Sequence, residues 1–340
     1  MLICQDCGRE NPDEFKFCSK CGKELIKPLP LGDSKLKVHR DRIRKIILQR
    51  KSTDTVISPM WVILLVAIIF VMTLAAIGMI IAAAVDLVRD YPSGDFPYPE
   101  LMDRAEPAIL TLTLQVIIYG TSLSLITYLL VARLRNHIKR ENALNTSIAE
   151  LLASAAGSDN RRKMLEDAHP TMSSTDTVPW QLGYPIVWAL VPLIPILAAI
   201  FQHWYIDTHE ILQRSDLNRG TYLTYPFTIL TIALEAYMFY FLGKSISEHD
   251  GHSSMFAQDS RLAMNDLGFP HGRSFDVGTI AYRSFWLYFV LSVITLGLWT
   301  YYWWYTLVKD PNIHFTKQWD FEDNVLDSID KAEEKLSPIT

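Results

Sequence analysis

The sequence predicts an all-α integral membrane protein, a bundle of about five transmembrane helices with a small metal-binding module at its N-terminus. Three observations predict this class. The stretch from Pro59 to Val85 carries no charged residue, and as a helix it would be roughly 40 Å long, more than the ~30 Å hydrocarbon core of a bilayer. The chain combines 49% hydrophobic with 20% charged residues, which is typical of apolar spans separated by polar connections. All four cysteines lie within the first 21 residues.

Two cysteine pairs define the first module, residues 1–25. Cys4 and Cys7 form one Cys-x-x-Cys-Gly turn, and Cys18 and Cys21 form a second. Glycine after each pair permits a positive φ, which lets backbone N–H groups point at sulfur. Four thiolates make a closed tetrahedral site suited to structural zinc. The stretch resembles a zinc ribbon, which implies a Zn²⁺ cofactor that folds the module. Iron is the alternative, because rubredoxins use similar knuckles.

Residues 26–58 form a basic linker with a predicted amphipathic helix before the first span. Eight Lys or Arg residues lie between Lys35 and Lys51. Apolar residues recur at helical spacing, at Leu36, Ile43 and Ile47. We expect this helix to lie on the anionic cytoplasmic leaflet, with anionic lipids as partners of Lys35–Lys51. Nucleic acid is not expected, because the net charge is -5 and the basic segment directly precedes a membrane span.

The membrane region, residues 59–308, is expected to cross the bilayer five times. The predicted spans lie near residues 59–85, 107–132, 178–206, 221–243 and 284–308. Pro185, Pro192 and Pro195 should kink the third span. Five complete crossings would leave the acidic tail, residues 309–340, on the side opposite the N-terminus.

The loops predict the orientation of these spans. Residues 133–163 carry seven Lys or Arg, whereas residues 86–106 carry two against six acids, and residues 207–220 also carry two. The positive-inside rule therefore places the cysteine module and residues 133–177 in the cytoplasm. By alternation the C-terminal tail of this cell-membrane protein is expected outside.

A short repeat conflicts with that last expectation. Thr-Asp-Thr-Val precedes the first and third spans, at residues 53–56 and 175–178. After three spans, a histidine is followed seven positions later by an apolar residue, in the pairs His137 with Leu144, His249 with Phe256 and His314 with Phe321. We interpret these as two and a half copies of a helical hairpin with a cytoplasmic tail. All three tails would share one side if residues 284–308 formed a re-entrant hairpin. We expect a plain crossing, because these 25 uncharged residues span comfortably.

The last apolar segment carries a Thr-x-Gly-x-Trp core and a Tyr-Trp exit, made by Thr295, Gly297, Trp299, Tyr302 and Trp303. About 45 residues around this core resemble a family of uncharacterised prokaryotic membrane domains. The resemblance implies a membrane location. It implies no catalytic residue, because the family has no settled activity.

Two polar residues lie inside predicted spans. Glu235 lies near the middle of the fourth span, and Gln115 lies in the second. An ionisable side chain at that depth is costly and usually faces the bundle interior. Glu235 is therefore a candidate proton or cation relay, or a contact for a lipid headgroup. The alternative is a structural hydrogen bond between helices, for example to Gln115.

Two further clusters have metal-ligand chemistry. His203, Asp207 and His209 gather at the outer end of the third span, where interfacial polar residues are also ordinary. Glu248, His249, Asp250 and His252 form a second run in a predicted cytoplasmic loop, for which a solvated polar turn is the alternative.

Three functions remain open at this stage. The chain shows no phosphate-binding glycine loop, no His-Glu-x-x-His and no dinucleotide fingerprint. The leading hypothesis is a non-enzymatic scaffold whose cysteine module and polar tails recruit protein partners. The second is a small transporter or channel subunit that uses Glu235. The third is a membrane-embedded enzyme that modifies lipid, for which the candidate residues lie at 203–210.

Overall fold

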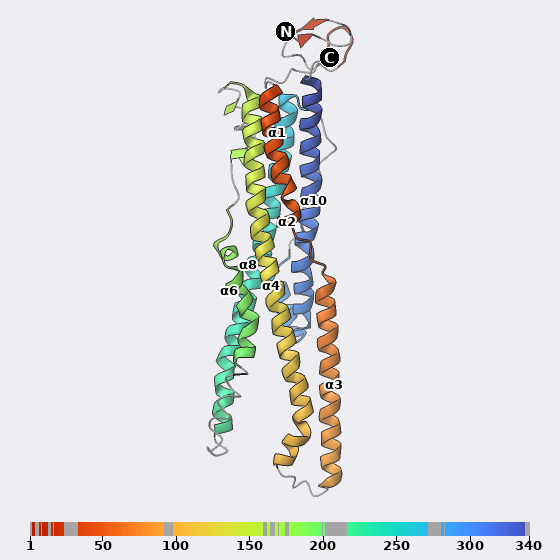
Figure 1. Cartoon of the computed structure of the whole chain (residues 1–340), viewed down its shortest axis with the longest axis vertical. Helices are drawn as coiled ribbons and strands as arrows, with labels where there is room; N and C mark the ends of the chain where they lie inside the picture. The colour runs from red at the N-terminus through yellow and green to blue at the C-terminus, as the bar shows by residue number, and fades with distance from the viewer. Residues whose placement is uncertain are drawn as a thin grey trace.

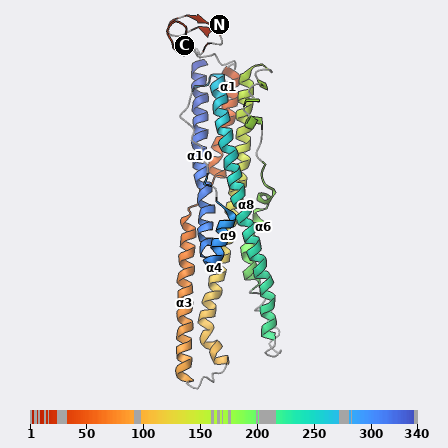
Figure 2. The same ribbon diagram turned by 180° about the vertical axis from the view of Figure 1, so that it is seen from behind.

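The protein is an elongated bundle of helices, shown in two opposite views in Figures 1 and 2. This computed structural model describes residues 2–3, 7, 9–12, 15, 17–23, 33–91, 98–158, 162–163, 167–168, 170–173, 177–198, 200, 216–270, 280–281 and 283–336. At one end a small hairpin pairs β1 (Leu2–Ile3) with β2 (Glu10–Asn11) in antiparallel register. Most of the other described residues lie in helices.

Long apolar helices form the half of the molecule farthest from this hairpin. Within the described residues, three helices are long and apolar enough to cross a membrane: α3 (Met60–Asp90), the Asp103–Ala156 part of α4 (Tyr98–Ala156), and the Ile229–Leu267 part of α8 (Asp216–Leu267). Helices α3 and α4 pack side by side over their apolar lengths (Figure 1). Their apolar side chains are largely exposed, as lipid-facing residues are. The chain is therefore a multi-pass membrane protein.

The third predicted span is short and broken where the structure describes it. It comprises η2 (Trp180–Gly183), α6 (Pro185–Leu190) and η3 (Val191–Leu193), followed by a helical turn to Ala198. Pro192 lies within η3, where its missing N–H interrupts the α-helical hydrogen bonds, so the α-helix is interrupted at this proline. Pro185 instead begins α6, a position that suits proline. Residues 201–206 lie outside the described part of the chain.

The prediction that residues 284–308 cross as one helix is wrong. Helix α9 (Phe285–Ile294) ends after ten residues, and α10 (Leu298–Leu336) runs back. Leu296 and Gly297 have φ of 49° and 90°. The Gly297 N–H bonds Ser292 O at 2.7 Å and the Leu296 N–H bonds Val293 O at 3.1 Å, which is the Schellman pattern that ends a helix. At ~1.5 Å per residue, α9 reaches only about halfway through a bilayer core.

The threonine and glycine of the Thr-x-Gly core have distinct parts in this turn. Thr295 Oγ1 donates to Leu291 O and accepts from the Trp299 N–H at 2.9 Å, so it caps the start of α10. Gly297 supplies the left-handed backbone that follows. The side chain of Leu296 is 94% exposed at the tip. An apolar hairpin tip of this kind fits a segment that dips into lipid and returns.

The two ends of the α9–α10 hairpin contact each other. The C-terminal tail therefore does not lie where the sequence predicted, on the side opposite the N-terminal segment. Arg283, just before α9, pairs with Asp310 on α10 at 2.6 and 2.9 Å. Farther along, α10 packs against α1 (Asp33–Leu48), where Arg40 pairs with Glu333. Figure 2 shows α1 and the end of α10 at the same end of the molecule. The expectation that the N- and C-terminal segments lie on opposite sides is therefore wrong, because the fifth apolar segment turns back.

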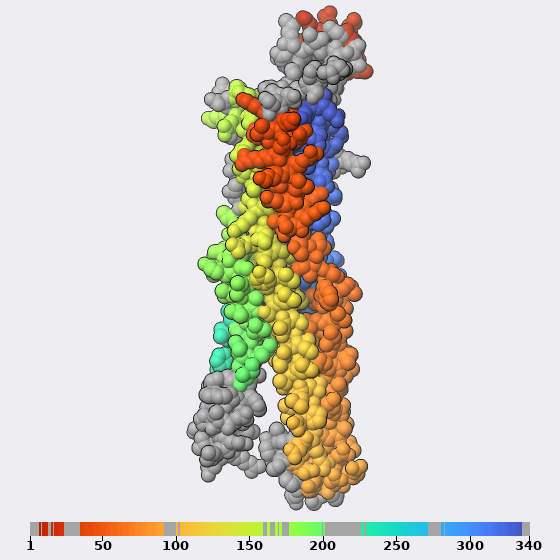
Figure 3. Space-filling view, in the orientation of Figure 1, coloured from red at the N-terminus to blue at the C-terminus, as the bar shows by residue number. Residues whose placement is uncertain are grey.

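The other half of the molecule is a helical bundle with its own apolar core. Helix α1 lies between α4 and α10 (Figure 3), and its apolar face, Leu36, Ile43 and Ile47, is buried in that core. We expected this face to rest on lipid; it packs against protein instead. The apolar residues seven positions after each repeat histidine meet here as well: Leu144, Phe256 and Phe321, with exposed fractions of 0%, 1% and 2%.

Gly120 on α4 tests the close approach of the broken third segment. A Cβ at this position would lie 2.7 Å from Ile196 Cδ1 and 2.8 Å from the Pro192 carbonyl oxygen. We expect Gly120→Ala to destabilise the apolar half by about 1–3 kcal/mol, because the backbone carbonyl has to move. Thermal unfolding of the purified protein in detergent measures this. Gly78→Ala on α3 is the matched control, since no atom lies within 4 Å of its added Cβ. Equal melting temperatures for the two variants would contradict the prediction.

Candidate metal centres

The cysteine module gathers its described thiols at one point. The Sγ atoms of Cys7, Cys18 and Cys21 lie within 4.8 Å of one another, and those of Cys7 and Cys18 are 3.5 Å apart. Cys4 lies outside the described residues. Three convergent thiols in a module this small are the arrangement of a structural metal site.

Backbone and side-chain groups orient Cys18. The Lys20 N–H points at Cys18 Sγ at 3.4 Å, and Gly22 adopts the positive φ, 69°, expected of the glycine after the second pair. The buried Asn11 side chain donates to Cys18 Sγ and accepts from the backbone and hydroxyl of Ser19, both at 2.9 Å. Burial opposes ionisation of Cys18, but N–H groups of Cys21 and Lys20 outweigh it and lower the pKa of the thiol to about 6. A thiolate is the form that binds metal.

A second centre lies inside the helical bundle, past the ends of the apolar segments. His137 and Glu141 are one turn apart on α4, His249 comes from α8 and His314 from α10. Their exposed side-chain fractions lie between 0% and 3%. Glu141 Oε2 is 3.1 Å from His137 Nε2, 2.9 Å from His249 Nε2 and 3.9 Å from His314 Nε2. Three imidazoles therefore surround one carboxylate oxygen.

A surrounding layer of polar groups contacts these side chains and orients them. Asp54 Oδ1 lies 3.0 Å from His137 Nδ1, and Asp250 Oδ1 lies 2.8 Å from His314 Nδ1. The other oxygen of Asp250 accepts the Ile280 N–H at 2.6 Å. Ser253 Oγ donates to Glu141 Oε1 at 2.5 Å. Two histidines thus each have a carboxylate behind the ring, which fixes the ring orientation.

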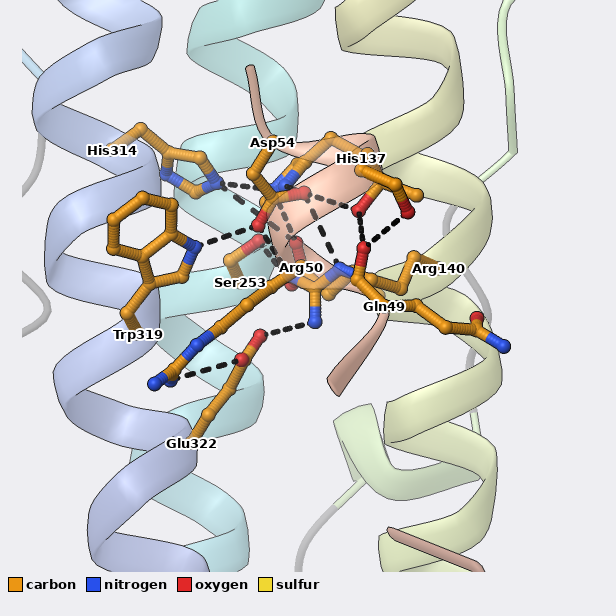
Figure 4. Close-up of polar contacts among 12 residues, drawn as sticks. Gln49, Arg50, Asp54, His137, Arg140, Ser253, His314, Trp319 and Glu322 are labelled. Carbon is orange, nitrogen blue, oxygen red and sulfur yellow. Dashed lines mark hydrogen bonds and ion pairs between the residues drawn. The ribbon is translucent and has the colours of Figure 1, made fainter. Parts of the chain in front are cut away.

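Arg140 connects this centre to α10. Figure 4 shows its guanidinium between Asp54 and Glu322, with Trp319 beside Asp54. Arg140 donates to Asp54 Oδ2 at 2.7 Å and lies 2.6 Å from Glu322 Oε1. The Trp319 indole N–H donates to Asp54 Oδ2 at 2.8 Å. Asp54 follows the short helix α2 (Arg50–Thr53), so the connection into the first span closes the centre.

The electrostatics of the centre follow from burial and these pairs. Burial alone would raise the pKa of Glu141, but the imidazoles, His249 foremost, hold it well below its usual range. Burial lowers the pKa of His137. Burial also opposes protonation of His314, yet the carboxylates of Asp250 and Glu141 raise its pKa. Burial raises the pKa of Glu322 to about 7 despite Arg140.

The predicted intramembrane residues do not pair with each other. Gln115 on α4 bonds Thr73 on α3, with its Nε2 3.1 Å from the threonine oxygen. Glu235 on α8 instead lines a cavity of about 270 Å³ together with Ser292, Gly297 and Thr300 of the hairpin. The proposed hydrogen bond between Glu235 and Gln115 is thus absent from the described contacts. His203, Asp207 and His209 lie outside the described residues.

Sequence reasoning found only part of the bundle centre. The alternative of a solvated turn at residues 248–252 is wrong for His249 and Asp250, which are buried in α8 with exposed fractions of 3% and 2%. Glu141 and Asp54 were not singled out as site residues. The signal that could have led to them is the repeat, because its three histidines are the three that converge.

Comparison with known proteins identifies two segments of the chain. Residues 3–25 match the zinc-ribbon domain family. These residues are a zinc-ribbon domain. Residues 283–325 match a domain of unknown function, DUF4234, as the Thr-x-Gly-x-Trp core predicted. That segment holds the hairpin and the α10 residues of the bundle centre. The chain matches no curated protein and no solved structure.

Arg140 gives a direct test of the bundle centre. We expect Arg140→Met to destabilise the fold by about 3–5 kcal/mol, because it leaves the buried Asp54 and Glu322 carboxylates without their shared cation. Unfolding of the detergent-solubilised protein, followed by circular dichroism, measures the loss. Lys139→Met, one residue earlier and exposed on the same helix, should change stability by less than about 0.5 kcal/mol. A similarly small loss for Arg140→Met would show that the ion pairs do not hold the bundle together.

Proposed function

We propose that this chain is a multi-pass membrane scaffold that holds a zinc-loaded ribbon away from the cytoplasmic face of the membrane to recruit a protein partner. The observation that carries the proposal is the continuity of the long helices. Helices α4 and α8 run from apolar segments into the bundle, and the ribbon lies at the bundle's far end (Figure 1). Zinc is favoured over iron because it is the ion that the matched domain is named for.

The length of the bundle suits a ribbon that is held at a distance from the membrane. From Arg133 to Ala156, α4 continues for 24 residues past its predicted span, about 36 Å at 1.5 Å per residue. Helix α1, the first described helix after the ribbon, is packed against α4 and α10 of this bundle. The basic excess in residues 133–163 favours a cytoplasmic bundle, and the hairpin then puts the tail there too. In this proposal the chain does not cross the membrane five times. Its membrane region consists of long spans, a broken third segment and a re-entrant hairpin.

The ribbon and the bundle differ in the partners they offer. Phe15 and Phe17 are exposed on the ribbon, by 41% and 59%, and exposed aromatic side chains are common anchors of protein interfaces. Basic residues of α1 and α2 pair with acidic neighbours in α4 and α10, namely Arg40 with Glu333, Arg42 with Glu150 and Arg50 with Asp323. We therefore assign protein partners to the ribbon. Anionic lipid is proposed only for the end of this segment near Lys51.

Site-specific cross-linking tests this proposal. A photoreactive residue in place of the exposed Lys20 should give a discrete protein adduct in intact cells. Phe17→Ser should abolish the adduct by removing the anchor, and Cys18→Ser should abolish it by unfolding the ribbon. Immunoblotting of the chain measures the shift in mass. Val38→Ser, which changes an exposed apolar residue of α1, is the control and should keep the adduct. An adduct that survives Phe17→Ser and Cys18→Ser, or no adduct at all, would rule out recruitment through the ribbon.

Glu235 supports a second candidate, a small transporter or channel subunit. Its side chain lines the cavity between α8 and the hairpin, and re-entrant segments recur next to ion pathways. Under this alternative, Glu235→Gln should abolish proton or cation flux in proteoliposomes, because the neutral amide cannot exchange a proton or balance a cation. Under the scaffold proposal it should leave the cross-linked adduct unchanged. Gln115→Asn, outside the cavity, is the control for flux.

A further inference from the structure

We propose that His137, Glu141, His249 and His314 bind one divalent first-row transition metal ion inside the bundle. This site is separate from the ribbon and does not depend on the scaffold function. The four side chains come from three helices and converge beyond the apolar segments. The metal would join α4, α8 and α10 at one point.

The separations of the ligand atoms fit coordination. Two ligands of a tetrahedral ion, each ~2.0–2.1 Å from it, lie about 3.3 Å apart. Around Glu141 Oε2 the imidazole Nε2 atoms lie at 2.9, 3.1 and 3.9 Å, and the Nε2 atoms of His137 and His314 are 3.1 Å apart. Glu141 Oε2 is buried, and among the described residues it accepts no hydrogen bond. These distances describe atoms arranged about a shared centre.

The outer carboxylates determine which nitrogen of each ring faces that centre. Asp54 and Asp250 lie 3.0 and 2.8 Å from the Nδ1 atoms of His137 and His314, which favours the tautomer of each ring with its proton on Nδ1. The Nε2 atoms then present lone pairs to one another at 3.1 Å, which is repulsive without a cation between them. In protein metal sites, a histidine that binds the ion through one ring nitrogen usually donates the N–H of the other nitrogen to a carboxylate. The alternative to a metal ion at this position is a proton on His314.

The charge of the centre also favours a cation. Four carboxylates, those of Asp54, Glu141, Asp250 and Glu322, lie in and around this centre. Arg140 pairs with Asp54 and Glu322, and Arg50 lies 3.8 Å from Glu322. These two guanidinium groups do not balance the four buried carboxylates. A divalent ion bound to neutral imidazoles would restore the balance, and this lowers the cost of burying the acids.

The donor set selects the class of ion. Three imidazole nitrogens and one carboxylate suit zinc, iron(II), cobalt(II) and related ions. Calcium and magnesium prefer all-oxygen sites, and copper(I) prefers thiolate or thioether. With four protein ligands the site is closed, so the ion is expected to hold the helices together.

Metal analysis of full-length protein separates this site from the ribbon. In the Cys7→Ser, Cys18→Ser double variant the ribbon cannot load, so bound metal reports the bundle. After purification in detergent and reconstitution with cobalt(II), we expect one cobalt per chain by mass spectrometry. Visible d–d bands should appear without the near-ultraviolet band of cobalt–thiolate charge transfer. Metal loading should raise the melting temperature, because the ion binds only the folded bundle.

Three further substitutions in that double variant complete the test. His249→Gln should abolish cobalt binding, because it removes a ligand. Asp250→Asn should weaken binding by about 10–100-fold, because it removes only the support behind His314. His252→Gln, on the same helix but outside the cluster, should bind like the parent. The proposal is overturned if the parent double variant binds no cobalt and shows no d–d bands, even when His249→Gln cannot be purified. Unchanged cobalt binding in His249→Gln would overturn it equally.

Discussion

The burial of ionised side chains between α4, α8 and α10 is the constraint on which the bundle depends. Asp54, Glu141 and Arg140 have exposed side-chain fractions of 0–2%. Charges this far from water are tolerated only when each has a partner at hydrogen-bond distance. The helices must therefore keep one register and one rotation relative to one another, since a shift of a single residue would separate the pairs.

The hairpin at the fifth apolar segment makes that centre possible. Had residues 284–308 crossed the bilayer, His314, Trp319 and Glu322 would lie on the opposite side from His137 and Asp54. The turn at Thr295–Gly297 reverses the chain, and the Arg283–Asp310 pair fastens the ends. Helix α10 then returns to meet α1 and α4. The match of residues 283–325 to one domain family includes both the hairpin and the returning part of α10, so the turn and the returning helix belong to one unit.

Much of the local structure was predictable. An uncharged run such as Pro59–Val85 has few alternatives to a membrane helix, and Cys-x-x-Cys-Gly has a strong local geometry. The face of α1 was predicted from spacing alone, and Leu36, Ile43 and Ile47 are indeed its buried residues. What covers that face was not predictable from spacing, because lipid and protein satisfy an apolar stripe equally well. The crossing of residues 284–308 was predicted wrongly for a related reason: apolar length is the same for a span and for a hairpin.

The sequence by itself determined that this chain is a membrane protein, that it carries a zinc-ribbon domain, and that a histidine recurs after three of its apolar segments. Those properties depend on composition and on spacing over a few residues. Only the tertiary structure decided that the three histidines meet around Glu141, with Asp54 and Asp250 behind two of them. Residues 54, 137, 249 and 314 are far apart in the chain, and their proximity depends on a chain reversal of three residues and on the packing of three helices. Neither is encoded in the local pattern around any one of them.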